Sequence, residues 1–414
     1  MTGPGPQLDR SVPALLVKVG RYPQHAGGLG VVRTLARRGV PVYAMVEDRF
    51  TPVALSRYLA GRVVCPTSGL EPPERLVRLL LAIGAGIGRP TVAVPTDDEA
   101  AVLLAEHAEQ LAGHFLLPPV PADLPRRLAS KEGLSRICER YGVPTPRAAA
   151  PADLAELLEL GRRWGYPLVL KNLEAWTRLS APVVQHTTLV RDEAQLRALV
   201  PTEGPLSVLA QEYLPADRSQ DWITHLYCGA GGAVRTVFTG RKVRSWPPES
   251  GVTTRAEALW NPPLAELAAG LCEALGYSGV ADLDWRLDLR DGRYKLVDFN
   301  PRTGAQFRLF ESTRGVDVVR ALHLDLTGRP VPAAEQRAPR SFVVGQLDLP
   351  SALCWARARR RPPPAVLPRR GVERAWLCAD DPWPAAAETV RFSGTVARRL
   401  ALAVRARQAR APRS

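Results

Sequence analysis

The residues best suited to chemistry lie in one stretch, residues 279–307, which reads GVADLDWRLDLRDGRYKLVDFNPRTGAQF. Its alternation predicts two antiparallel strands joined by a tight turn. Residues two apart on a strand point to the same side, so Asp298 and Asn300 project together, and Asp284 can reach them from the neighbouring strand. Two carboxylates and an amide oxygen suit Mg²⁺ carrying nucleotide phosphates. Arg302, the next position on that side, would meet phosphate.

A solvated hairpin with alternating polar residues is the alternative to such a site. Leu296, Val297 and Phe299 make the second strand substantially apolar. Acidic residues on an apolar strand favour a pocket over a solvated surface.

Lysine is rare in a chain that otherwise uses arginine for positive charge. The five lysines are Lys18, Lys131, Lys171, Lys242 and Lys295. An ammonium group is a compact point charge that suits one phosphate oxygen in a crowded site.

One lysine stands in the basic segment TGRKVRSW. Strand alternation predicts Lys242 and Arg244 on one face and Arg241 on the other. A solvated basic edge strand is the alternative reading of this segment.

Apolar runs and helical spacing divide the chain before and after the hairpin. A strand, a glycine-containing loop, a helix and a second strand open a parallel α/β domain that extends to about residue 118, where a proline-rich linker follows. Later helices are predicted at 130–141, 151–164, 263–275 and 317–326, and later strands at 168–171, 183–191, 207–213, 221–228 and 233–241.

The hairpin resembles the metal-binding hairpin of the ATP-grasp superfamily, whose usual form ends in Glu-x-Asn-x-Arg. Both usual glutamates are aspartates here, Asp284 and Asp298, and Asn300 completes the metal set. The other motifs follow in the family's order. The resemblance implies that Lys131 and Lys171 bind nucleotide phosphates.

The same resemblance assigns the remaining nucleotide contacts. The segment containing Gln211, Glu212 and Leu214 is similar to the hinge around the adenine, and Asp221 corresponds to the ribose-binding acid. The resemblance also implies that Lys242, Arg244 and Arg302 are the cations that neutralise the γ-phosphate, the acyl phosphate or the incoming carboxylate.

The fold implied is α/β and α+β, a Rossmann-like pre-ATP-grasp domain followed by a two-subdomain ATP-grasp fold. The expected divisions are a pre-ATP-grasp domain at 1–120, an N-subdomain at 121–204, a C-subdomain with the metal hairpin at 205–328, and an Arg- and Pro-rich basic C-terminal extension at 329–414.

One segment departs from the family pattern. The glycine-rich lid expected after the second lysine reads NLEAWTRLSAP, without glycine. A subset similar to carbamoyl-phosphate synthase large-chain domains also has a poor lid, and we place the chain with that subset. Trp176, Thr177 and Arg178 are candidates to replace the missing backbone donors.

The resemblance implies an ADP-forming carboxylate–amine ligase. ATP and Mg²⁺ (or Mn²⁺) would activate a small-molecule carboxylate as an acyl phosphate, which a nitrogen nucleophile attacks to form an amide or peptide-like bond. Amino acids or peptides fit these substrate classes. The shortened acids and the glycine-free lid keep a catalytically silent nucleotide-binding protein as an alternative.

Charge distribution bears on a second alternative. The net charge of +14 is concentrated after residue 330, where sixteen arginines stand against six acidic residues. Such a tail could bind an acidic surface or nucleic acid, but its apolar runs favour a folded extension, so we do not expect a nucleic-acid partner.

The remaining features concern the setting of the protein. The first residues lack the pattern of a signal peptide, and no apolar run is long enough for a membrane span. Six scattered cysteines without paired spacing favour a reducing, cytoplasmic location. Proteins of this resemblance are often homodimers. Gly27, Gly28 and Gly30 form a partial GxGxxG, which leaves a dinucleotide fold as a runner-up.

Overall fold

The N-terminal part of the chain forms a five-stranded parallel sheet. A computed structural model describes residues 5–22, 25–173, 182–184, 187–201, 204, 206–247, 251–359 and 371–410. The strand order is β3-β2-β1-β4-β5, with β1 (Ala14–Val17), β2 (Val42–Val46), β3 (Gly61–Val64), β4 (Thr91–Pro95) and β5 (Phe115–Leu116). Its helices are α1 (Ala26–Ala36), α2 (Pro73–Ile87), α3 (Asp98–Glu106) and α4 (Ala108–Leu111).

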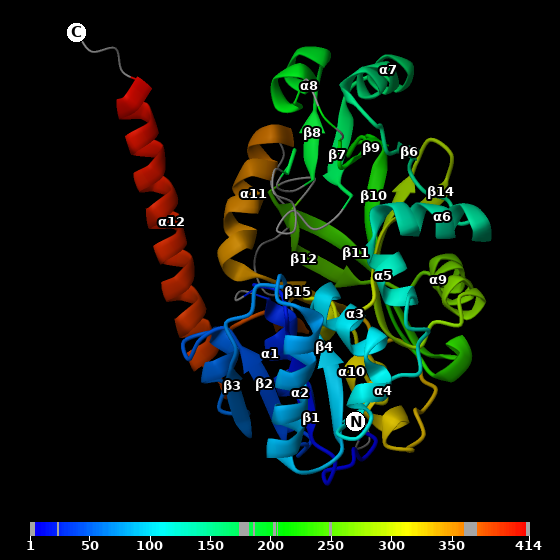
Figure 1. Ribbon diagram of the computed structural model, residues 1–414, viewed down its shortest axis with the longest axis vertical. Coiled ribbons are helices and arrows are strands. Elements are labelled where there is room, and N and C mark those ends of the chain that lie inside the picture. The colour runs from blue at the N-terminus through cyan, green and yellow to red at the C-terminus, as the bar shows by residue number, and fades with distance from the viewer. Residues whose placement is uncertain are drawn as a thin grey trace.

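The middle of the chain forms a smaller antiparallel sheet at the top of Figure 1. Its order is β6-β9-β7-β8, with β6 (Ala148–Ala149), β7 (Leu168–Asn172), β8 (Thr188–Val190) and β9 (Val208–Glu212). Helices α7 (Leu154–Trp164) and α8 (Glu193–Leu199) pack on it through a leucine-rich core. The helix predicted at 130–141 is confirmed as α6 (Lys131–Tyr141), which follows α5 (Leu124–Ala129).

A seven-stranded sheet carries the predicted hairpin. Its order is β14-β13-β10-β11-β12-β15-β16, with β10 (Ser219–Cys228), β11 (Val234–Trp246), β12 (Val252–Ala258), β13 (Gly279–Asp288), β14 (Arg293–Asn300), β15 (Arg340–Val343) and β16 (Val372–Arg374). The hairpin β13–β14 is confirmed. Helix α9 (Pro262–Ala274) packs on one face and α10 (Val318–Leu326) on the other.

One hydrophobic core joins the N-terminal sheet to the seven-stranded sheet. It includes Leu16 of β1 and Leu29 of the neighbouring helix α1, and Ile223 and Phe238 of the seven-stranded sheet, all at most 1% exposed. The two regions therefore pack together through this core; Figure 1 shows the N-terminal sheet below the strands of the larger one.

The glycines of the partial GxGxxG allow this close packing. A Cβ added at Gly27 would lie 2.8 Å from the carbonyl oxygen of Gly304, and one at Gly30 would lie 2.7 Å from the ring of Phe307. Both approaches are shorter than side-chain atoms tolerate. The glycines thus bring α1 against the segment that follows β14, which accounts for them without a dinucleotide.

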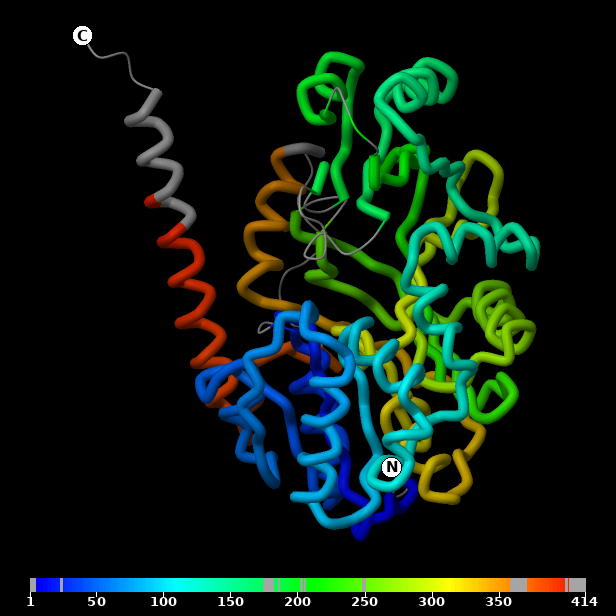
Figure 2. Tube along the Cα trace, in the orientation of Figure 1, coloured from blue at the N-terminus to red at the C-terminus, as the bar shows by residue number. Residues whose placement is uncertain are grey.

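The chain after Gly328 continues the same sheet. β15 pairs with β12, and β16 pairs with β15. Helices α11 (Gly345–Arg359) and α12 (Trp383–Arg410) complete this part. Figures 1 and 2 show α12 beginning beside the N-terminal sheet and running away from it.

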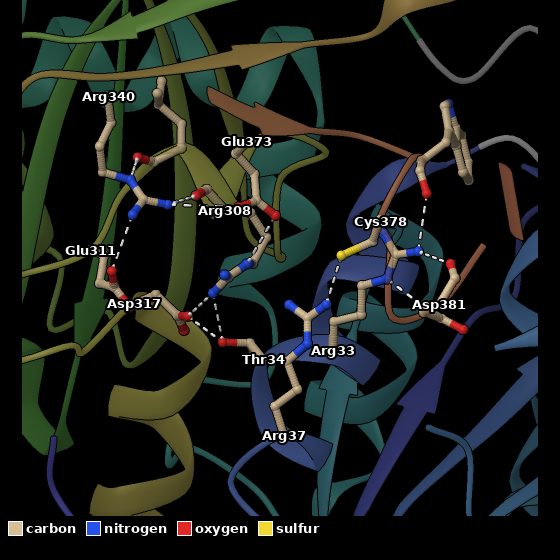
Figure 3. Close-up of polar contacts among 12 residues, drawn as sticks. Arg33, Thr34, Arg37, Arg308, Glu311, Asp317, Arg340, Glu373, Cys378 and Asp381 are labelled. Atoms are coloured by element: carbon tan, nitrogen blue, oxygen red, sulfur yellow. Dashed lines mark hydrogen bonds and ion pairs between the residues drawn. The ribbon is translucent and has the colours of Figure 1, made fainter. Parts of the chain in front are cut away.

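Hydrogen bonds of a buried aspartate, Asp381, link this C-terminal part to the N-terminal region (Figure 3). Asp381 is fully buried, and its carboxylate accepts hydrogen bonds from Arg33 Nε at 3.0 Å, Ser56 Oγ at 2.8 Å and the backbone N–H of Arg57 at 3.0 Å. Arg33 also donates to the carbonyl oxygen of Trp376. The buried charge is thereby paired on every side.

Among the described residues, no helix combines the length and the apolar composition that a bilayer crossing requires.

Candidate functional site

A cavity of about 330 Å³ opens between the four-stranded sheet and the seven-stranded sheet. Strands β7 and β9 supply one wall, and β10, β11, β13 and β14 supply the floor. Eight of the residues singled out in the sequence line it: Lys171, Gln211, Glu212, Leu214, Asp221, Lys242, Asp284 and Asp298.

The strand register brings the proposed metal-binding acids together. Asp284 lies directly opposite Asp298, and Asp282 lies directly opposite Asn300. The Asn300 amide nitrogen donates to the carbonyl oxygen of Asp282 at 3.0 Å, so its amide oxygen is the atom that can ligate a cation. Directly opposite residues lie about 5 Å apart, which is close enough for two carboxylates to share one ion.

These donors fit a hard cation such as Mg²⁺. Within the described ranges, no cluster of three His, Cys, Asp or Glu side chains could hold a metal alone. A cation here would therefore draw on Asp284, Asp298 and the Asn300 amide, together with oxygens of a bound phosphate.

Each of the two acids already faces a lysine. Lys131, the first residue of α6, contacts the Asp298 carboxylate, and Lys242 Nζ lies 2.5 Å from Asp284 Oδ1. Burial alone would lower the pKa of both lysines, but the facing carboxylates outweigh it and hold each pKa above its usual value. Both lysines remain charged at physiological pH.

The acids themselves titrate differently. Burial, helped by Asp282, raises the pKa of Asp284 despite Lys242. Burial acts on Asp298 too, but Lys131 and Lys171 outweigh it and lower the pKa of that carboxyl. Asp298 therefore carries the firmer negative charge of the pair.

Lys171 is the lysine of the cavity whose pKa is lowered. It is the penultimate residue of β7 and is 8% exposed. Burial lowers the pKa of its ammonium to about 8, and the nearby Lys131 charge lowers it further, while Asp298 opposes the shift. An incompletely neutralised buried ammonium is poised to accept an anion.

Hydrogen bonds and ion pairs also surround the predicted adenine hinge, which contains Glu212 and Leu214. Glu212 Oε1 accepts from the backbone N–H of Arg147 at 3.1 Å and from Lys295 Nζ at 3.3 Å. Burial would raise the pKa of Glu212, but these contacts lower it. Leu214 is 3% exposed, and Asp221 Oδ1 accepts from Arg286 Nε at 2.6 Å. The Glu212 and Asp221 carboxylates are thus each paired with a cationic side chain, Lys295 and Arg286 respectively.

Arg302 connects the hairpin to the N-terminal sheet. Its Nη1 donates to Asp282 Oδ2 at 3.1 Å, and its Nε lies 3.4 Å from Asp98 Oδ1. His225 Nε2 lies 3.0 Å from the other Asp282 oxygen. Burial would raise the pKa of Asp282, but His225 and Arg302 hold it well below its usual range.

Sequence reasoning missed Asp282, His225 and Asp98. The available signal was position: Asp282 stands two residues before Asp284 and so shares its face of β13. His225 lies directly opposite Asp282 on β10, a pairing that the sequence alone does not reveal.

The structure does not bring Arg244 into the cavity group. A register shift in the β11–β12 pairing falls between Lys242 and Arg244, so the predicted alternation is interrupted. Arg244 instead donates to Asp348 of α11, with Nε at 2.8 Å from Oδ1 and Nη2 at 2.5 Å from Oδ2. The lid candidates Trp176, Thr177 and Arg178 lie outside the described residues.

Comparisons with known proteins concern the fold of the chain. No protein-family model matches the chain. It is 22% identical over 292 residues to D-aspartate ligase of Enterococcus faecium, which covers 67% of this chain and 68% of the relative. The L-amino acid ligase from Bacillus licheniformis superposes with a TM-score of 0.57 at 19% identity, over 76% of this chain and 74% of that structure.

A nucleotide-bound structure extends the comparison. The biotin carboxylase domain of 2-oxoglutarate carboxylase from Hydrogenobacter thermophilus, solved with MgADP, ADP and bicarbonate, superposes with a TM-score of 0.53 at 16% identity, covering 80% of this chain and 72% of that one. The chain has the ATP-grasp fold. The mixed parallel and antiparallel sheets expected from the ATP-grasp resemblance are therefore confirmed.

Proposed function

We propose that this ATP-grasp chain is an ADP-forming ligase that activates a carboxylate with ATP and joins it to a nitrogen nucleophile. The observation that supports this most directly is the pair of lysine–carboxylate contacts on the cavity floor. Lys131 faces Asp298 and Lys242 faces Asp284. A triphosphate with Mg²⁺ could replace both contacts at once, because the lysines would turn to phosphate oxygens and the acids to the metal.

Residues in and beside the cavity then have tasks in nucleotide binding and phosphoryl transfer. Lys171 and Lys131 would bind phosphate oxygens, and Glu212 and Leu214 would hold the adenine. Asp221 would meet the ribose. Mg²⁺, when bound by the acids and Asn300, neutralises charge on the moving γ-phosphate.

Two further cations, Lys242 and Arg302, would act on the substrate. Lys242 reaches the cavity beside Asp284, and Arg302 is held by Asp98 and Asp282 at the boundary with the N-terminal sheet. Both would stabilise negative charge on the acyl phosphate. Arg244, fixed by Asp348, would support Lys242 from the adjoining strand segment without touching the substrate.

The substrate class that we propose is a small carboxylate and an amino-acid amine. D-aspartate ligase and L-amino acid ligase, the similar proteins reported above, support this choice. All six cysteines are free thiols in the structure, which is consistent with the cytoplasmic location that we propose.

Substitution of Asp298 tests the proposal. ADP release is measured with MgATP and mixtures of L- and D-amino acids, D-aspartate included. We expect Asp298→Asn to keep metal-free ATP binding but to lose about a hundredfold or more in turnover, because one charged contact to the metal is lost. Asp298→Glu restores a metal-binding acid and should retain activity. Asp123→Asn, an exposed control on the same chain, should match the wild type.

The outcomes separate the proposal from its alternative. ATP binding without ADP release in any mixture would favour a catalytically silent nucleotide-binding protein. Normal turnover by Asp298→Asn would place the metal site elsewhere.

A further inference from the structure

A second cavity, of about 390 Å³, lies between the β12–β15–β16 edge of the large sheet and the first turns of α11 and α12. It shares no lining residue with the nucleotide cavity. Its walls are largely apolar, with Val343, Val372 and Leu377 among them. Nothing in the proposed ligase reaction uses this space.

Positive charge gathers on the sheet side of this cavity. In the strand register Arg255 lies opposite Val343, and Val343 lies opposite Arg374. The three side chains therefore stand in one row across β12, β15 and β16, with the two guanidinium groups flanking the valine. With strands about 4.8 Å apart, the two arginine Cα atoms are roughly 10 Å apart.

Arg255 is buried, and one of its guanidinium nitrogens has no hydrogen-bond acceptor in the described part of the chain. Its side chain lies in a residue that is only 7% exposed, and its Nε–H meets no hydrogen-bond acceptor there. Arg244, its register partner on β11, shows the contrast, because two hydrogen bonds to Asp348 neutralise it. Asp348 also lines the cavity, but its carboxylate is already engaged by Arg244 and Thr254.

Two further features favour a negatively charged ligand. The indole N–H of Trp376, a residue 5% exposed, likewise meets no acceptor among the described residues. Gly345 and Gln346 line the cavity from the first turn of α11, a helix of 15 residues whose N-terminus carries partial positive charge. Glu388 completes the α12 wall and accepts from Gln346 Nε2 at 2.9 Å.

We propose that this cavity binds a small organic carboxylate whose acid group is held by Arg255 and the Trp376 indole N–H, while its apolar body packs on Val343, Val372 and Leu377. A buried guanidinium N–H without an acceptor is costly, and a ligand carboxylate would satisfy it with a charge-assisted hydrogen bond. Glu388, across the cavity, would face the ammonium of an amino acid. The proposal goes beyond the ligase reaction and does not depend on it.

Three matched probes show which chemical groups of a ligand are needed for binding to this cavity. L-leucine carries an acid, an amine and an apolar body; isocaproate lacks the amine, and isoamylamine lacks the acid. Inorganic phosphate tests whether any anion suffices. Binding to the full chain, saturated with a non-hydrolysable ATP analogue so that the nucleotide cavity is filled and no turnover occurs, is followed by titration calorimetry and ligand-observed NMR.

We expect L-leucine or isocaproate to bind saturably at millimolar concentrations or below, and isoamylamine not to bind. Arg255→Gln should weaken binding about tenfold or more, because a charged hydrogen-bond donor is lost. Trp376→Phe should weaken it several-fold while keeping the aromatic wall. Arg337→Gln, an exposed arginine of the same region that pairs with Glu311, is the matched control and should change nothing.

ATP affinity reports whether each variant is folded, and Trp376→Phe decides the matter if Arg255→Gln does not fold. The proposal is overturned if neither carboxylate binds up to about 10 mM, if phosphate binds and the carboxylates do not, or if the folded variants bind the carboxylates as the wild type does.

Discussion

Lys171 should make nucleotide binding fall with rising pH in a range where few other groups titrate. Burial lowers the pKa of this ammonium to about 8. Lys131 and Lys242 face carboxylates that raise their pKa values, so they stay protonated there. The last ionisation of a phosphate group has a pKa of about 6, so nucleotide phosphates are largely ionised before pH 7 is reached. Between pH 7 and 9, Lys171 is thus the cavity group that we expect to change charge.

The magnitude follows from that pKa. With a pKa of about 8, roughly nine-tenths of the free protein carries the Lys171 proton at pH 7 and about one-tenth at pH 9. A bound phosphate holds the proton on, so the apparent Kd must rise by about tenfold over this interval. Calorimetric titration with a non-hydrolysable ATP analogue, at four or more pH values and constant ionic strength, measures this slope.

Lys171→Arg is the matched control, because a guanidinium stays protonated throughout this range. We expect weaker binding at every pH, since a planar fork suits the position poorly, but a flat profile. A flat profile in the wild type, or an equally steep one in Lys171→Arg, would refute the assignment of Lys171 to the phosphate site.

Three further predictions concern stability and positioning. Lys171→Met should abolish nucleotide binding. It should also raise the unfolding free energy of the ligand-free protein at pH 7 by about 3 kcal/mol, because burying protonated Lys171 destabilises the folded state. This gain in stability, measured from urea midpoints, should shrink as the pH rises from 8 towards 10.5, the ordinary lysine pKa. Asp381→Asn should lower stability by about 3–5 kcal/mol by leaving Arg33 buried and uncompensated, and limited proteolysis should then cut the C-terminal part first. Gly304→Ala should reduce ADP release more than ATP binding. The added methyl group would lie 2.3 Å from Asp282 Oδ2 and would displace the carboxylate that holds Arg302. Unchanged kinetics would show that Asp282 does not position Arg302.

The hairpin could be predicted because its information is local. Asp298 and Asn300 are two residues apart on one strand, and the alternation of apolar residues fixes which way they point. Their partner Asp284 belongs to the strand joined by the same short turn. Local patterns also placed Lys131 at the start of a helix and Lys171 near the end of a strand, whereas their assignment to the phosphates came from the resemblance to ATP-grasp proteins.

Arg244 shows why other parts could not be predicted. Alternation holds only while the register is regular, and the shift between Lys242 and Arg244 cannot be seen in the sequence. The acid that binds Arg244 is Asp348, 104 residues further along the chain. Strands β15 and β16 escaped detection because they are four and three residues long and lie in a segment rich in Pro and Arg.

The late position of β15 in the chain has a consequence for synthesis on the ribosome. β12 ends at Ala258, but the strand that covers its outer edge begins only at Arg340. At roughly 5–20 residues per second, the edge waits on the order of ten seconds for its neighbour. During that interval β12 offers unpaired backbone groups to other nascent chains. Yield in the cell should therefore depend on chaperone supply, even where the finished protein is stable.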